Sequence, residues 1–91
     1  MTQSLDSNIC GVLVRVRPDQ VDATCAALNA LPGVEVHRVL DRGQLAVTVE
    51  DTPGQRATET LVRLHNVDGV LAVSLVYHRI ESEPLSEGVP Q

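Results

Sequence analysis

Alternating and clustered apolar positions predict four strands in this chain. The first covers residues 9–16, where β-branched side chains are frequent, and the others cover residues 34–40, 45–50 and 70–78. Gly43, between the second and third strands, can take the left-handed backbone of a tight turn. We therefore expect these two strands to form a hairpin.

Two segments with apolar residues at helical spacing separate the strands. Pro18 suits the first turn of one helix, which is predicted to end near Leu31. Thr52 is the predicted N-cap of the other helix, with Pro53 as its first residue and Asn66 near its end. The apolar stripes expected to face the core are Val21, Cys25 and Leu28 in the first helix, and Ala57, Leu61 and Leu64 in the second.

The order of elements, β-α-β-β-α-β, predicts an α+β fold made of two βαβ halves. Right-handed crossovers place both helices on one face of a four-stranded antiparallel sheet, which is the ferredoxin-like sandwich. We expect residues 8–79 to form this domain, residues 1–7 to be a flexible N-terminus, and residues 80–91 to be a disordered acidic tail. Helices then cover one sheet face, and the other is available to a partner.

Alternation along each strand divides its residues between the two faces. The residues expected under the helices are Cys10, Val12, Val14, Val16, Val34, Val36, Leu40, Leu45, Val47, Val49, Leu71, Val73, Leu75 and Tyr77. The candidate binding residues, expected on the uncovered face, are Ile9, Gly11, Leu13, Glu35, His37, Val39, Ala46, Thr48, Glu50, Ala72, Ser74, Val76 and His78. Small and apolar side chains dominate this second set, which favours binding of an apolar helix or strand. The alternative is an ordinary solvated sheet face with scattered apolar residues.

Composition narrows the class of partner. The chain carries twelve acids and seven arginines, no lysine, and a net charge of −5. An acidic domain repels phosphate backbones, so nucleic acid is not expected as a partner, and a basic peptide or protein patch is the better match. The alternative is that the negative charge serves solubility alone.

Candidate chemistry is sparse, and no enzyme activity is expected. Cys10 and Cys25 belong to no CxxC motif and are predicted to be reduced core residues. Ser74 and His78 are four residues apart on one strand, about 13 Å, so they cannot act together as nucleophile and base. The sequence has no phosphate-binding loop and no closely spaced metal ligands, and we expect no cofactor.

The start of the chain bears on location. Residues 1–8 contain no basic residue and no apolar run, which argues against an export signal. No apolar window approaches the length of a membrane span. We therefore expect a cytoplasmic protein with no stable membrane association.

Three segments carry a resemblance to a known family. They are residues 31–37 (LPGVEVH), residues 43–50 (GQLAVTVE) and residues 69–78 (GVLAVSLVYH), the last followed by Glu81. Over about residues 8–81 the sequence resembles the NapD family, the assembly chaperones of periplasmic nitrate reductase. The resemblance implies a cytoplasmic chaperone without a cofactor of its own. Such a chaperone binds the twin-arginine (Tat) signal peptide of the catalytic subunit as a helix against its sheet, and so delays export until the molybdenum cofactor and the iron–sulfur cluster are inserted.

The resemblance and the predicted uncovered face together suggest a binding mode. The apolar part of the signal peptide is expected over Leu13, Ala46, Ala72, Ser74 and Val76, and acids such as Glu35 and Glu50 are expected to attract its arginine pair.

Two alternatives remain open. One is an ACT-like regulatory domain that binds a small molecule, although such domains commonly have a glycine-containing loop after the first strand, where this chain has Arg17, Pro18 and Asp19. The other is a passive subunit that forms a weak homodimer through its uncovered sheet face.

Overall fold

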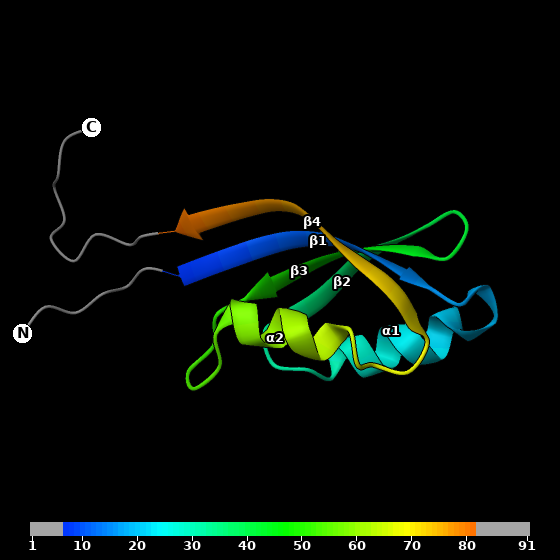
Figure 1. Cartoon of the computed structure of the whole chain (residues 1–91), viewed down its shortest axis with the longest axis horizontal. Helices are drawn as coiled ribbons and strands as arrows, with labels where there is room; N and C mark the ends of the chain where they lie inside the picture. The colour runs from blue at the N-terminus through cyan, green and yellow to red at the C-terminus, as the bar shows by residue number, and fades with distance from the viewer. Residues whose placement is uncertain (1–6, 82–91) are drawn as a thin grey trace, which may run out of the picture.

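The computed structural model describes residues 7–81 (Figure 1). The elements, in chain order, are β1 Ser7–Val16, a 3-10 turn Pro18–Gln20, α1 Val21–Asn29, β2 Val34–Leu40, β3 Gln44–Glu50, α2 Ala57–Leu64 and β4 Val70–Glu81. β1 starts at Ser7 and β4 continues to Glu81 because these two residues still pair with each other, so the fold extends beyond the predicted 8–79 at both ends. The rest of the predicted N-terminus and acidic tail, residues 1–6 and 82–91, lies outside the described residues.

The four strands form one antiparallel sheet in the order β2-β3-β1-β4. Both helices lie on the same side of this sheet (Figure 1), where α1 packs on β2 and α2 packs on β3 and β1. The predicted ferredoxin-like sandwich is therefore confirmed. Its two edge strands are β2 and β4, and the helices lie over the other three strands more than over β4.

The core lies between the helices and the central strands. The pairing of β1 with β3 places their apolar residues opposite one another on the helix side, as the alternation predicted. The buried apolar side chains are Cys10, Val12, Val14, Val16, Leu28, Val34, Leu45, Val47, Val49, Ala57 and Leu64. Two buried polar residues, Thr24 and Thr60, donate their hydroxyl hydrogens to the backbone oxygens of Asp68 and Arg56. These bonds offset the cost of burying a hydroxyl group.

The second helix begins later than predicted. The backbones of Thr52 and Gln55 pair across a tight turn that contains Pro53, so this proline precedes the helix. The first helical N–H, that of Ala57, donates to the Asp51 carboxylate at 2.7 Å. The prediction of Thr52 as N-cap is therefore wrong: Arg56 is the residue at the N-cap, and the Asp51 carboxylate reaches over the turn to accept the first helical N–H.

A β-bulge interrupts the pairing of β4 with β1. Leu75 lies opposite Val12 and Tyr77 lies opposite Gly11, which leaves Val76 as an additional residue in β4. An additional residue moves everything after it to the opposite face of the sheet, relative to strict alternation. The faces of Tyr77 and of the residues that follow it therefore differ from those predicted.

Two further irregularities have the same effect. Leu71 is additional near the start of β4, between residues paired with the end of β1. His37 is additional in β2, between Val36 and Arg38, which lie opposite consecutive residues of β3. Bulges are frequent on edge strands, where they also discourage pairing with another chain.

Candidate functional site

The sheet side that faces away from the helices, the open face, is the candidate site. Its centre is formed by the alternate residues of β1 and their partners on β3, which are Ile9, Gly11, Leu13 and Arg15 with Glu50, Thr48, Ala46 and Gln44. Neither helix of residues 7–81 covers it (Figure 1). The small side chain of Ala46 keeps its middle low, so another backbone could approach closely there.

Most of the candidate binding residues lie on the open face. On β2, Glu35 pairs with Thr48, and the His37 side chain bonds to the same threonine. On β4, Ala72 pairs with Arg15. The predicted residues that the structure brings together there are Ile9, Gly11, Leu13, Glu35, His37, Ala46, Thr48, Glu50, Ala72, Ser74 and Val76.

Val39 and His78 do not belong to this set, and their prediction is wrong. After the bulge at His37, Val39 pairs with the core residue Leu45 and is on the helix side of the sheet. After the bulge at Val76, His78 pairs with the core residue Cys10. The same shift brings Leu40, which was predicted to be buried, to the open side opposite Gln44.

His78 has a structural role instead. Its Nε2 donates a hydrogen bond of 2.9 Å to the side-chain oxygen of Asn8. The amide nitrogens of Asn8, side chain and backbone, donate to the Asp51 carboxylate at 2.9 and 3.0 Å. This chain of bonds ties the ends of β4 and β1 to the start of α2.

Tyr77 was predicted to lie in the core, but it lies on the open face. It pairs with Gly11, and its ring covers that glycine so closely that an added Cβ would overlap it. The Arg79 guanidinium is 5.8 Å from the ring centroid, in range for a cation–π contact. The tyrosine remains 43% exposed and is therefore available for contact with a ligand.

The sequence contained only a weak signal for this placement. Leu75, Val76 and Tyr77 are three consecutive bulky residues, so the pattern allows either register and an interruption at any of them. A glycine opposite an aromatic residue is a known pairing in sheets, but it requires the register to be known first.

Leu71 and Leu75 were also predicted under the helices, and neither is buried. The bulge at Leu71 places this residue at the open side, beside Arg15 and Gln44. Leu75 does point to the helix side, opposite Val12, but it is 59% exposed because the helices lie mainly over the other three strands.

A shallow apolar trough runs along β1 on the open face. It consists of three neighbouring hollows of 260, 270 and 280 Å³. The first lies between His37 and Tyr77, it shares Leu13 with the second, and the second shares Arg15 and Gln44 with the third. The hollows are therefore neighbours along β1, from its middle to its end.

Two acids lie at the end of the open face where β1 begins. Glu50 is opposite Ile9, and Glu35 is at the start of the neighbouring strand. The His37 ring lies beside Glu35. Its Nε2 is 2.7 Å from Thr48 Oγ1, and its Nδ1 is 3.9 Å from a Glu35 carboxylate oxygen. This end of the face is suited to a positively charged group.

The two cysteines are poorly placed for chemistry. Both are unpaired thiols, Cys10 in the core and Cys25 half-buried on α1. Burial, and to a lesser extent the charge of Asp51, raises the pKa of the Cys10 thiol. Burial, and to a lesser extent the charge of Asp22, raises the pKa of the Cys25 thiol. Both therefore stay protonated at neutral pH and are weak nucleophiles.

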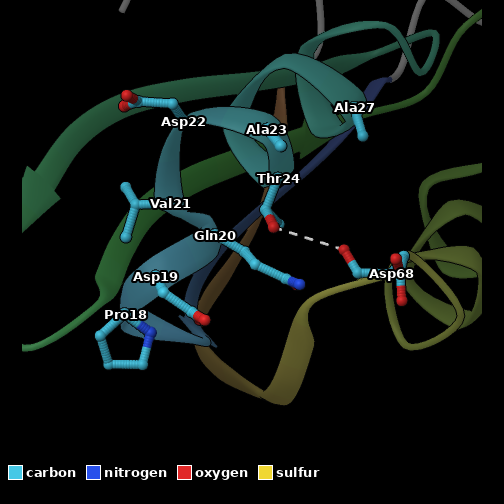
Figure 2. A pocket seen from close by; sticks show the side chains of 9 residues that line it. All are labelled: Pro18, Asp19, Gln20, Val21, Asp22, Ala23, Thr24, Ala27 and Asp68. Carbon is cyan, nitrogen blue, oxygen red and sulfur yellow. Dashed lines mark hydrogen bonds between the residues drawn. The ribbon is translucent and has the colours of Figure 1, made fainter.

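A larger hollow of 730 Å³ lies on the helix side, beside the first turn of α1 (Figure 2). Its lining includes Asp19, Asp22 and Asp68, and Thr24 donates across it to the Asp68 backbone at 3.3 Å. The first two acids stabilise the positive end of the helix, which explains their presence without a ligand. Among residues 7–81, no three His, Cys, Asp or Glu side chains group as metal ligands would.

Neither helix in the described part of the chain is long and apolar enough to cross a membrane.

Comparison with known proteins places the chain among chaperones. Residues 7–82 match the family model described as NapD protein. The chain is 40% identical over 77 residues to the Chaperone NapD of Escherichia coli K12, covering 82% of this chain and 87% of the relative. It is 27% identical over 79 residues to the Chaperone NapD of Haemophilus influenzae, covering 86% and 85% of the two chains.

A solved structure agrees with these matches. The solution structure of the E. coli Tat proofreading chaperone protein NapD superposes with a TM-score of 0.71 at 36% sequence identity. The superposition covers 93% of this chain and 88% of the other.

Proposed function

Because the chain belongs to the NapD family, we propose that it is a Tat proofreading chaperone that binds a twin-arginine signal peptide on its open face. The proposed partner is the signal peptide of the catalytic subunit of periplasmic nitrate reductase. Binding occurs in the cytoplasm and holds the precursor back until its cofactors have been inserted. This function requires recognition alone and no catalytic group. The single observation that carries the proposed binding site is the row of neighbouring hollows on a sheet face that neither described helix covers.

The trough matches the apolar segment of a signal peptide. Such a segment is an uninterrupted run of 7–15 apolar residues. Small side chains at Ala46, Ala72 and Ser74 let a helical backbone lie close to the sheet, and Leu13, Val76 and Tyr77 supply apolar walls. Of the eight large apolar side chains with high exposure in residues 7–81, three lie on the open side of β4, which borders the trough: Leu71, Val76 and Tyr77.

Apolar burial accounts for more of the affinity than charge pairing does. Burying roughly 300 Å² of apolar surface contributes on the order of 7 kcal/mol before the costs of association. An ion pair between an arginine and an exposed acid such as Glu50 contributes only about 0–1 kcal/mol. The acids therefore serve to select and orient the peptide.

The membership in the NapD family also decides between the alternatives drawn from the sequence. An ACT-like domain would bind a small molecule in the loop after β1, and that loop here is a 3-10 turn that begins with Pro18. The NapD match covers the whole described fold, so we retain the chaperone function and not the ACT-like one.

Substitution of one small residue in the trough tests the proposal. We expect Ala72→Arg to weaken binding of the synthetic signal peptide at least about tenfold, because the long side chain fills the middle hollow. Binding is measured by isothermal titration calorimetry, and the melting temperature is expected to change by less than about 2 °C because Ala72 is exposed.

The matched control is Ala26→Arg, the same substitution at an exposed position of α1. It adds the same charge on the helix side and should leave the affinity within about twofold of the wild type. Unchanged binding by Ala72→Arg would show that the peptide does not use the trough.

A further inference from the structure

We infer that the open face fixes the direction of the bound peptide. The twin-arginine end lies at Glu35 and Glu50, and the carboxyl end of the apolar segment lies at Arg15 and Arg42. This inference rests on the proposed function, because it assigns a direction to the same peptide in the same trough. The distribution of charge along the open face supports the inferred direction.

One end of the face, the acidic end, is defined by Glu35 and Glu50. Both acids are exposed and lie on neighbouring strands, opposite Thr48 and Ile9. Arg79 lies at the same end on the other side of Ile9, where its guanidinium is directed over the Tyr77 ring. The acids are thus on the β2–β3 side and the arginine is on the β4 side, so the attraction for a cation is concentrated on β2 and β3.

The other end, the basic end, is defined by Arg15 and Arg42, which line the last hollow of the trough. Arg38 lies opposite Ala46, one open-face position from Glu35 along β2, and is therefore between the two ends. One acid, Asp41, is exposed in the turn beside Arg42 and reduces this positive charge without cancelling it. An arginine pair placed here would be repelled by like charges, whereas at the acidic end it would be attracted.

The dipole of a helical peptide favours the same direction. The amino end of a helix carries about half a positive charge and its carboxyl end about half a negative one. When the amino end lies at Glu35 and Glu50, the carboxyl end faces Arg15 and Arg42. Arginine pair and helix dipole therefore act together, and the reversed direction is unfavourable for both.

The distance between the acidic and basic ends fits a single apolar segment. Ile9 and Arg15 are six residues apart on β1, which corresponds to about 20 Å along a strand. A helix of about 13 residues has the same length. The segment between the arginine pair and the carboxyl end can therefore span the distance between the acidic and basic ends.

Paramagnetic labels on the peptide test the direction. Two synthetic signal peptides carry a maleimide-linked nitroxide, one at the amino end and one at the carboxyl end of the apolar segment. The maleimide link prevents exchange with Cys10 and Cys25. Amide spectra of the ¹⁵N-labelled full chain are recorded with each peptide, before and after reduction of the nitroxide.

We expect the amino-end label to broaden the amides of Glu35 and Glu50, and the carboxyl-end label to broaden those of Arg15 and Arg42. The opposite assignment, or equal broadening at both ends by each label, would overturn the inferred direction. An unlabelled peptide is titrated first. If it shifts no open-face amide, the proposed function itself fails, which separates that failure from an error of direction.

Charge reversal gives a second measurement. The double variant Glu35→Lys, Glu50→Lys should weaken peptide binding by about three- to tenfold and should increase the broadening seen in the reversed direction. The control Asp68→Lys makes the same type of change at an exposed loop on the helix side and should alter affinity by less than about twofold. Equal effects of the double variant and the control would contradict the inference.

Discussion

At the scale of single residues, the open face depends on the contact between Gly11 and Tyr77. The tyrosine ring covers the glycine and forms one wall of the first hollow, opposite His37. Any side chain at position 11 would displace the ring. The glycine is thus required by a close approach between two strands, and the ring is held in a position where it can contact a ligand.

A double-mutant cycle tests this contact. We expect Gly11→Ala to lower the free energy of unfolding by about 1 kcal/mol, since the added methyl group overlaps the Tyr77 ring. In the Tyr77→Ala background the same change should be neutral or slightly stabilising, because alanine restricts the unfolded chain more than glycine does. Urea denaturation measures all four proteins, and equal costs of Gly11→Ala in the two backgrounds would contradict the proposed contact.

At the scale of secondary-structure elements, Asp51 joins three of them. Its carboxylate accepts hydrogen bonds from the backbone N–H of Ala57 at the start of α2, and from the backbone and side chain of Asn8 on β1. It lies directly after the last residue of β3. These bonds lower the pKa of the Asp51 carboxyl because they favour its charged form, and the bond from Ala57 has the largest effect.

The lowered pKa predicts a pH-dependent contribution to stability. A carboxyl whose pKa is lower in the folded state stabilises the fold fully above its unfolded pKa, about 3.9, and loses this effect as the pH falls through the folded value. We expect Asp51→Asn to be less stable than the wild type by about 1–2 kcal/mol at pH 7. The difference should remain constant down to about pH 5 and shrink below about pH 4.

Denaturation at a series of pH values provides the measurement. Asp68→Asn, an amide substitution at an exposed acid, should show no comparable difference at any pH. A difference between Asp51→Asn and the wild type that does not change between pH 5 and pH 2 would show that the charge of Asp51 is not what holds the start of α2.

At the scale of the whole molecule, the two sides of the sheet have different roles. The helix side holds the buried apolar residues that stabilise the fold, and the open face keeps small and apolar residues exposed in a trough. The chain as a whole carries a net charge of −5, which attracts a basic peptide from a distance. Attraction at long range and apolar burial at contact are separable, since salt screens only the first.

An increase in salt concentration should therefore change the association rate more than the dissociation rate. Between 50 and 500 mM NaCl, we expect the Kd for the signal peptide to rise by less than about tenfold, mainly through slower association. Stopped-flow fluorescence with a labelled peptide measures both rates. As a control, a peptide in which glutamines replace the arginine pair should bind with little salt dependence. If the unmodified peptide lost nearly all its affinity at high salt, charge pairing would be the dominant contribution.

The sequence by itself determined the class of fold, the positions of all four strands, the presence and order of both helices, and the faces of β1 and β3. These follow from local properties, because a central strand with one covered face must alternate and its burial fixes the register. The interpretation of the open face as the candidate site also needed no coordinates, since eleven of its residues were placed by alternation alone.

Only the tertiary structure decided the faces of the edge strands. Bulges at His37, Leu71 and Val76 brought Tyr77 to the open face and moved Val39 and His78 to the helix side. An edge strand pairs on one side and is less covered, so burial does not force a single register on its sequence. The start of α2 was likewise decided by a contact between distant residues, Asp51 with Asn8 and Ala57, which no local pattern encodes.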